Sequence, residues 1–513
     1  MLCIPAIEKT AIRNATLFLA VFALLFAAGV ASGQESTQKT PDPASATLPL
    51  TSKSPEAQRL VVEAMRVGLD LVEQEQCDVM LRQAINLDPD FALAHELLAQ
   101  NSLDPAEQVL ENGKAWALRG HTSPAERLLI EWWQDATDHK LISAITKMND
   151  LLSQYPHDKW VVFMATNWLI TQTQYDRAIA VYERSGITDS AGLLNNMGYT
   201  YAYMREFDKA FALMDKYVAA LPKDANPQDS YAEILRMAGS FNKSLEHYRA
   251  SLAIDHQFYS SQFGIADTYS LMGDQVRARQ EYESAFKQFP LPELHRVQWQ
   301  TREAETFIRE GDLKGADQAF QAIADYAHSK HMSQVEADAY RQMAMYQPDP
   351  KQALQFISKA EAALKEGKNS MPAAIHQEQA QILRAHLEAA LKTGNRQTVH
   401  TLLVHLSEMA ASSNDRLIDA AYQGAAGAVA FSQHKYDEAI SHLEEDKNNP
   451  LSLKLLAAAY QKIGYSAGAK RTSETLANLN DPTLEQAMVV PPFRKCYEDP
   501  SCTGNVKAVS LKK

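Results

Sequence analysis

Small residues recur at nearly constant spacing through the middle of the chain, at Ala144, Ala178, Ala210, Ser244 and Ala278. The intervals between them are 34, 32, 34 and 34 residues. A larger side chain follows each one four positions later, in the series Met148, Tyr182, Met214, Tyr248 and Tyr282. Residues four apart lie on the same face of an α-helix. The pattern therefore predicts a helical unit that is repeated along the chain and stacked on its neighbours.

Each unit is predicted to contain two helices. Between residues 191 and 222, the run LLNNMGYTYAYM predicts the first helix and FDKAFALMDKYVAAL the second, with Arg205 and Glu206 at the turn. A small residue on the first helix precedes the small residue on the second by twelve positions, at Gly198, Ala232 and Ala266. Two helices approach closely only where the side chains at their crossing are small. We therefore expect each pair of helices to cross at these positions.

These residues resemble the pattern of the tetratricopeptide repeat family. The unit from Ala191 supplies its small, aromatic and closing positions as Gly198, Tyr201, Phe207, Ala210 and Pro222. The unit from Tyr259 supplies Ala266, Tyr269, Ala278, Tyr282, Ala285 and Pro290. The resemblance implies an all-α fold, an α-solenoid that winds as a right-handed superhelix of about twelve helix-turn-helix pairs.

The amino terminus has a different character. Lys9 and Arg13 precede an apolar run over residues 15–31 that ends in small residues, which is the layout of a secretory signal peptide. The run is short for a membrane span, although an uncleaved anchor is the alternative. We therefore predict a periplasmic or secreted bacterial protein.

We expect six segments along the chain. They are a signal peptide (1–33), a flexible linker rich in Ser, Thr and Pro (34–55), N-terminal repeat-like helices (56–124), a regular repeat array (125–290), divergent repeat-like helices (291–480) and a C-terminal tail (481–513). The apolar run MVVPPF in the tail is predicted to cap the last repeat, with docking of a partner as the alternative.

Cysteines suggest structural roles. Cys77 occupies the small-residue position of an early second helix and is expected to be a buried thiol. Cys496 and Cys502 bracket YEDPS, a turn-forming stretch, and a disulfide between them is predicted for an oxidising compartment.

Nothing in the sequence predicts catalysis, a metal site or a cofactor. Residues 464–468 match the G-x-S-x-G pattern of a nucleophile elbow, but a predicted helix precedes them where that motif needs a strand. The histidines lack metal-ligand spacing. We therefore expect no catalytic residue and no bound metal.

The family resemblance implies a concave groove lined by the first helices. Its register places thirteen residues in a groove that binds a protein or peptide: Trp133, Trp160, Phe163, Asn167, Asn195, Asn196, Tyr199, Tyr203, Asp229, Glu233, Arg236, Phe263 and Asp267. Aromatic rings give apolar contact, and amides can pair with a peptide backbone. Asn167 and Asn196 also fall on two positions of the family's carboxylate clamp. Phe163 replaces one of its basic residues, so no clamp is predicted.

Three functional hypotheses follow. The first is a non-catalytic interaction scaffold that binds a protein or peptide. The second is a secreted, toroid-type helical enzyme that processes glycans with paired carboxylates. The third is a membrane-tethered structural protein of an envelope complex. Nucleic acid is not an expected partner, because the net charge is −13 and no basic stripe is present.

Overall fold

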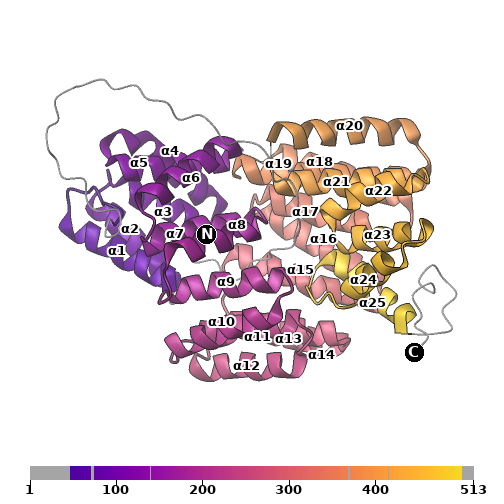
Figure 1. Ribbon diagram of the computed structural model, residues 1–513, viewed down its shortest axis with the longest axis horizontal. Helices are drawn as coiled ribbons and strands as arrows, with labels where there is room; N and C mark the ends of the chain where they lie inside the picture. The colour runs from indigo at the N-terminus through magenta and orange to yellow at the C-terminus, as the bar shows by residue number, and fades with distance from the viewer. Residues whose placement is uncertain (1–46, 71–73, 139, 368–369, 414, 499–513) are drawn as a thin grey trace.

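The computed structural model describes residues 47–70, 74–138, 140–367, 370–413 and 415–498 (Figure 1). These residues form 25 α-helices and no strand. The predicted signal peptide and most of the predicted linker lie outside the described residues.

Twenty-four of the helices form twelve consecutive pairs. The first six pairs are α1 (Pro55–Asp70) with α2 (Gln74–Leu87), α3 (Ala92–Asn101) with α4 (Pro105–Leu118), α5 (Pro124–Thr137) with α6 (Leu141–Gln154), α7 (Lys159–Thr171) with α8 (Tyr175–Ser185), α9 (Ala191–Tyr203) with α10 (Phe207–Ala220), and α11 (Ala225–Met237) with α12 (Phe241–Ile254). The last six are α13 (Tyr259–Met272) with α14 (Gln275–Gln288), α15 (Glu293–Glu310) with α16 (Leu313–Ser329), α17 (Ser333–Tyr346) with α18 (Pro350–Lys365), α19 (Pro372–Thr393) with α20 (Arg396–Ser413), α21 (Arg416–Ser432) with α22 (Tyr436–Leu443), and α23 (Pro450–Lys462) with α24 (Ser466–Ala477). A single helix, α25 (Leu484–Glu498), follows them. The predicted all-α solenoid of about twelve pairs is confirmed.

The predicted helix crossings are present. Ala144, Ala178, Ala210, Ser244 and Ala278 are all fully buried. A Cβ atom on Gly198 of α9 would lie 2.1 Å from Cε of Met214 on α10. A further close contact, between successive pairs, was not predicted: a Cβ atom on Gly264 of α13 would lie 2.3 Å from the ring of Tyr248 on α12. Gly198 and Gly264 therefore leave room for Met214 and Tyr248, the large side chains that follow Ala210 and Ser244 by one helical turn.

Helix pairs that are far apart in the sequence are also in contact, because the superhelix curves back on itself. Helix α5 of the third pair contacts α19 of the tenth pair. Beyond the twelfth pair, the main-chain oxygen of Asn478 accepts a hydrogen bond from Arg205 Nη2, at the end of α9, at 2.6 Å. Figure 1 shows the last helices beside α15, which comes from the middle of the chain.

Helix α1 covers part of the concave side. It contacts α7 and α9, the first helices of the fourth and fifth pairs. A Cβ atom on Gly192 of α9 would lie 1.8 Å from the main-chain oxygen of Leu69 on α1, so only glycine fits there. The N-terminal part of the groove is thus filled by the chain itself.

Residues 47–54, the described part of the predicted linker, form an extended strap along the first helices. Leu48 N donates to Asp158 Oδ2 at 3.0 Å, at the start of α7. Thr51 N donates to Glu126 Oε1 at 2.8 Å, in the first turn of α5. Lys53 N donates to Asp88 Oδ2 at 2.8 Å, before α3. The strap therefore connects three successive pairs through one carboxylate each.

Helix α25 caps the array, as predicted for its MVVPPF run. Val489, Val490 and Phe493 pack with Leu453 and Leu476 of the twelfth pair. Leu484 and Ala487 join the core formed by α15–α18. Cys77 is buried, as expected. Cys502 lies outside the described residues, so the predicted disulfide with Cys496 stays a prediction.

Glu96 of α3 is a fully buried carboxyl group that accepts hydrogen bonds from the neutral amides of Gln100 and Asn112. Burial raises the pKa of Glu96 from 4.5 to about 8. Between these values the native chain keeps a proton that the unfolded chain loses. The free energy of unfolding should therefore fall as pH rises, with Glu96 contributing about 1.4 kcal/mol per pH unit.

The Glu96→Gln variant should lack this contribution. Urea unfolding of both chains at several values between about pH 5 and pH 8 measures the slope. Glu438→Gln, at an exposed position, serves as the control and should keep the wild-type slope. An unchanged slope in Glu96→Gln would contradict the assignment.

Candidate binding lumen

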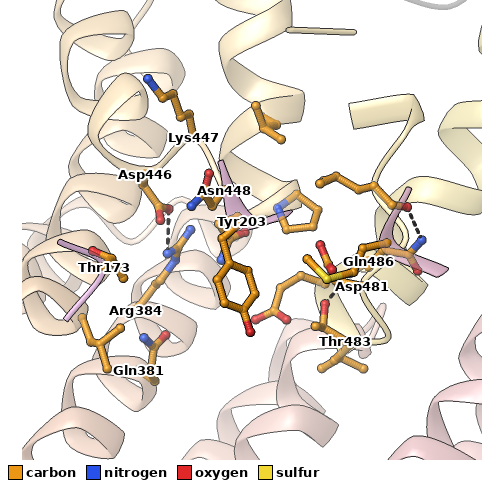
Figure 2. A pocket seen from close by; sticks show the side chains of 18 of the residues that line it. Thr173, Tyr203, Gln381, Arg384, Asp446, Lys447, Asn448, Asp481, Thr483 and Gln486 are labelled. Carbon is orange, nitrogen blue, oxygen red and sulfur yellow. Dashed lines mark hydrogen bonds and ion pairs between the residues drawn. The ribbon is translucent and has the colours of Figure 1, made fainter. Parts of the chain in front are cut away.

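A cavity of about 1320 Å³ lies inside the superhelix, and we call it the lumen. Its walls come from the first helices α15, α17 and α19, from the end of α9, and from the last two helix pairs with residues 479–486. In Figure 2, Tyr203 lies between the Arg384–Asp446 pair and a group formed by Asp481, Thr483 and Gln486. The lumen is therefore bounded by elements from three separate parts of the chain.

Three glutamines project into the lumen from successive first helices: Gln298 on α15, Gln334 on α17 and Gln381 on α19. All three are partly exposed. Within the described part of the chain, no hydrogen bond engages any of their side-chain amides. Each amide can both donate and accept. The lumen therefore offers a row of polar groups that are available to a ligand.

Two arginines in the wall, Arg341 and Arg384, are paired with carboxylates. Arg341 Nε donates to Glu378 Oε1 at 2.7 Å, and Glu378 is buried while Arg341 is partly buried. Arg384 Nη1 lies 2.8 Å from Asp446 Oδ2, and Arg384 Nη2 donates to Ser452 Oγ at 3.1 Å. Burial raises the pKa of Glu378 to about 7 and that of Asp446 to about 6, while the arginines oppose the increase. These ion pairs hold α19 against α17 and against the segment before α23.

The predicted groove residues of the first three units are mostly buried in the N-terminal core. Trp133, Trp160 and Phe163 belong to one apolar cluster with residues of α1 and α3. Asn195 and Asn196 are buried in α9, and Asn167 is half-buried in α7.

The later predicted residues form a buried polar network. Arg236 donates to Asp267 Oδ2 at 3.0 Å and to Glu233 Oε1 at 3.2 Å. Glu233 Oε2 also accepts from the Tyr199 hydroxyl at 2.6 Å. Asp229 accepts from Ser261 at 2.6 Å, and burial raises the pKa of Asp229 to about 7. The ring of Phe263 stacks on Trp299 at 4.7 Å. The structure thus brings these residues together as interior contacts between successive pairs.

Tyr203 is the predicted groove residue that lines the lumen. The glutamines and arginines of α15, α17 and α19 were not singled out from the sequence. The first-helix register that led to Asp267 does not reach them, because the successive steps from Asp267 to Gln298, Gln334 and Gln381 are 31, 36 and 47 residues, whereas the regular repeats step by 32 to 34. The register is lost in the divergent repeats, whose first helices reach 18 residues in α15 and 22 residues in α19.

The remaining motifs take structural positions. Gly464 has a φ of 79° at the turn after α23, and Ser466 begins α24, so the G-x-S-x-G match joins two helices. Among the described residues, no cluster of three or more His, Cys, Asp or Glu side chains could hold a metal ion. No helix in the described ranges has the length and apolar character needed to span a bilayer.

No protein-family model and no curated protein matches the sequence. Solved structures with similar folds include a tetratricopeptide repeat protein from Parabacteroides merdae, which is 14% identical, covers 52% of this chain and 92% of its own, and has a TM-score of 0.34. YrrB, described as a TPR protein with an unusual peptide-binding site, is 13% identical, covers 40% of this chain and 96% of its own, and has a TM-score of 0.24. An IFIT1 monomeric mutant with Gppp-AAAA is 13% identical, covers 79% and 94%, and has a TM-score of 0.36. By its own helix pairs, the chain has an all-α, tetratricopeptide-repeat-like solenoid fold.

Proposed function

We propose that this chain is a non-catalytic scaffold that binds an extended segment of a partner protein in its lumen. The observation that carries the proposal is the row of available amides at Gln298, Gln334 and Gln381. A peptide in extended conformation presents N–H and C=O groups along its length, and glutamine amides can pair with both.

The size and charge of the lumen support this class of ligand. Its volume of about 1320 Å³ exceeds the roughly 300–1,000 Å³ of small-molecule sites. Acidic side chains outnumber basic ones in its wall, and Arg341 and Arg384 are paired with Glu378 and Asp446. A site for nucleic acid would instead present an excess of basic residues to the phosphates.

We place this scaffold outside the cytoplasm, as a secreted or periplasmic member of the tetratricopeptide repeat family. The support is the signal-peptide layout of residues 1–33 in the sequence. The mass of the mature chain from its host tests the placement: loss of these residues supports cleavage, and their retention supports an N-terminal anchor.

Crosslinking capture of partners from the host's envelope fraction tests the lumen. The test variant combines Gln298→Ala, Gln334→Ala and Gln381→Ala. Its matched control combines Gln280→Ala, Gln288→Ala and Gln355→Ala, which are exposed positions on second helices. We expect the lumen variant to lose specific partners that the wild type and the control retain.

Circular dichroism of both variants should match that of the wild type, because the six glutamines are not core residues. If the lumen variant is folded and captures the same partners as the control, the lumen is not the binding site and the proposal fails.

A further inference from the structure

The lumen lies between two arms of the solenoid. The amino-terminal arm contains the first seven pairs, α1–α14, and the carboxy-terminal arm contains α15–α25. Residues 173–177, 202–205 and 237 of the amino-terminal arm line the lumen, and the rest of its wall belongs to the carboxy-terminal arm. In Figure 2, Tyr203 of the first arm lies between Asp446 and Asp481 of the second. We call the boundary between the arms the seam, and a ligand in the lumen would contact both sides of it.

The seam has little apolar packing away from the junction between α14 and α15. In the described part of the chain, each apolar cluster holds residues of one arm, apart from the cluster at this junction, where Trp299 of α15 stacks on Phe263 of α13. Burial of apolar surface is the main source of the free energy that holds packed helices together. The arms can therefore separate across the lumen more easily than the pairs within one arm can.

Hydrogen bonds join the arms beside the lumen. Arg205 Nη2 donates to the main-chain oxygen of Asn478 at 2.6 Å, and Asn480 Nδ2 donates to that of Met237 at 3.3 Å. We call these two bonds the latch. Asn480 is also held within its own arm, because Arg494 Nη2 of α25 donates to Asn480 Oδ1 at 2.6 Å. The latch can therefore break at Arg205 and Met237 while Asn478 and Asn480 stay packed with α25.

Arg205 keeps a strained backbone conformation at the latch. Its φ is 60° at the turn between α9 and α10, whereas Gly239 and Gly273 follow the first helices of the next two pairs with φ of 79° and 97°. A positive φ is unfavourable for a residue that has a Cβ atom. Glycine would relieve this strain but would lack the guanidinium that reaches Asn478. The strain therefore occurs where a side chain closes the seam.

We propose that the two arms form a clamp, which opens at the seam to admit the partner segment from the side and closes over it through the latch. An extended segment within a folded partner has no free end with which to thread the lumen lengthwise. Separation of the arms gives the segment a path, and closure brings both arms into contact with it. This inference rests on the proposed function, because it takes the lumen to be the partner site and adds how the partner enters.

Thiol labelling of the full chain tests the clamp. The reporter is Gln381→Cys in the lumen, and the reagents are N-ethylmaleimide and a maleimide that carries a polyethylene glycol chain. Mass spectrometry of the peptide that contains residue 381 separates its reaction from that of the native cysteines. The latch variant combines Arg205→Gln with Asn480→Asp, which removes both side-chain donors of the latch and keeps the Oδ1 acceptor for Arg494.

We expect the bulky reagent to label the latch variant at least about tenfold faster than the chain with an intact latch, because the lost hydrogen bonds stabilise only the closed state. The rate with N-ethylmaleimide should change much less. Equal rates with the bulky reagent in the two chains would overturn the proposal. An equal increase for both reagents would also overturn it, since local loosening of α19 would expose the thiol to small and large reagents alike.

Two controls keep the result specific to the latch. Arg184→Gln changes an exposed arginine of α8 that donates to Ala180 O of its own helix at 2.9 Å, and it should leave the bulky reagent at its original rate. Faster labelling in this control would remove the role of the latch. Gln355→Cys, exposed on α18, should react with the bulky reagent equally fast with or without the latch, and a tenfold rise there would likewise contradict the clamp.

Failure of the clamp and failure of the proposed function are distinguishable. If the triple glutamine variant loses its partners but breaking the latch leaves labelling unchanged, the clamp fails while the proposed function stands. If breaking the latch opens the lumen but the glutamine variant keeps its partners, the proposed function fails while the clamp stands.

Discussion

Replacing Asp446 by alanine is expected to lower the free energy of unfolding by about 3–5 kcal/mol. Asp446 is fully buried, and its Oδ2 lies 2.8 Å from Arg384 Nη1 and accepts from Ser452 Oγ. Removing the carboxylate leaves the buried guanidinium of Arg384 with Glu388 as its remaining ion-pair partner, at 3.3 Å. Urea unfolding followed by circular dichroism measures the loss.

A control at an exposed acid separates this effect from a general change of charge. Glu438→Ala, on the exposed face of α22, should change stability by no more than about 0.5 kcal/mol. Gly424→Ala should disturb the same ion pair, because the new Cβ atom would lie 2.3 Å from Asp446 Oδ2 and 2.5 Å from Arg384 Nη2. If Asp446→Ala were as mild as Glu438→Ala, the buried pair would not hold the last repeats together.

Ala210→Trp is expected to destabilise the middle of the array by more than the roughly 1–3 kcal/mol of ordinary overpacking. Ala210 is fully buried where α10 crosses α9, in a cluster with Met214 and Ile234. An indole cannot fit without separating the two helices. Thermal unfolding should show a lower midpoint.

Lys216→Trp is the matched control for this substitution. Lys216 lies on the same helix, α10, but is exposed to solvent. The control should unfold near the wild-type midpoint, because the new ring meets no packed neighbour. Similar losses in the two variants would mean that the helix crossing is not the cause.

The helix pairs could be predicted from the sequence because their contacts are local. Ala210 and Met214 are one turn apart, and their partner Gly198 is twelve residues away. Such spacing recurs in the units that start at Ala191, Ala225 and Tyr259, so the pattern identifies their crossings directly.

Contacts between distant parts of the chain leave no comparable pattern. The bond from Arg205 to Asn478 joins residues 273 apart, and nothing in either local sequence indicates the other. The family's register predicted Trp160 and Phe163 in an open groove, but it could not indicate that α1 packs over α7, because that contact also joins distant parts of the chain. One signal was available: the run KWVVFMATNWLIT is apolar on nearly all sides, and such a helix is usually buried all round.

The strap formed by residues 47–54 has a mechanical consequence if the predicted signal peptide stays attached and anchors the protein to a membrane. A pulling force ahead of Leu48 would reach the bond to Asp158 first, then the bond from Thr51 to Glu126, and finally that from Lys53 to Asp88. The three hydrogen bonds of the strap would therefore break one after another. The tether would lengthen in small steps before tension reached α1, and the solenoid behind it would stay folded under a modest load.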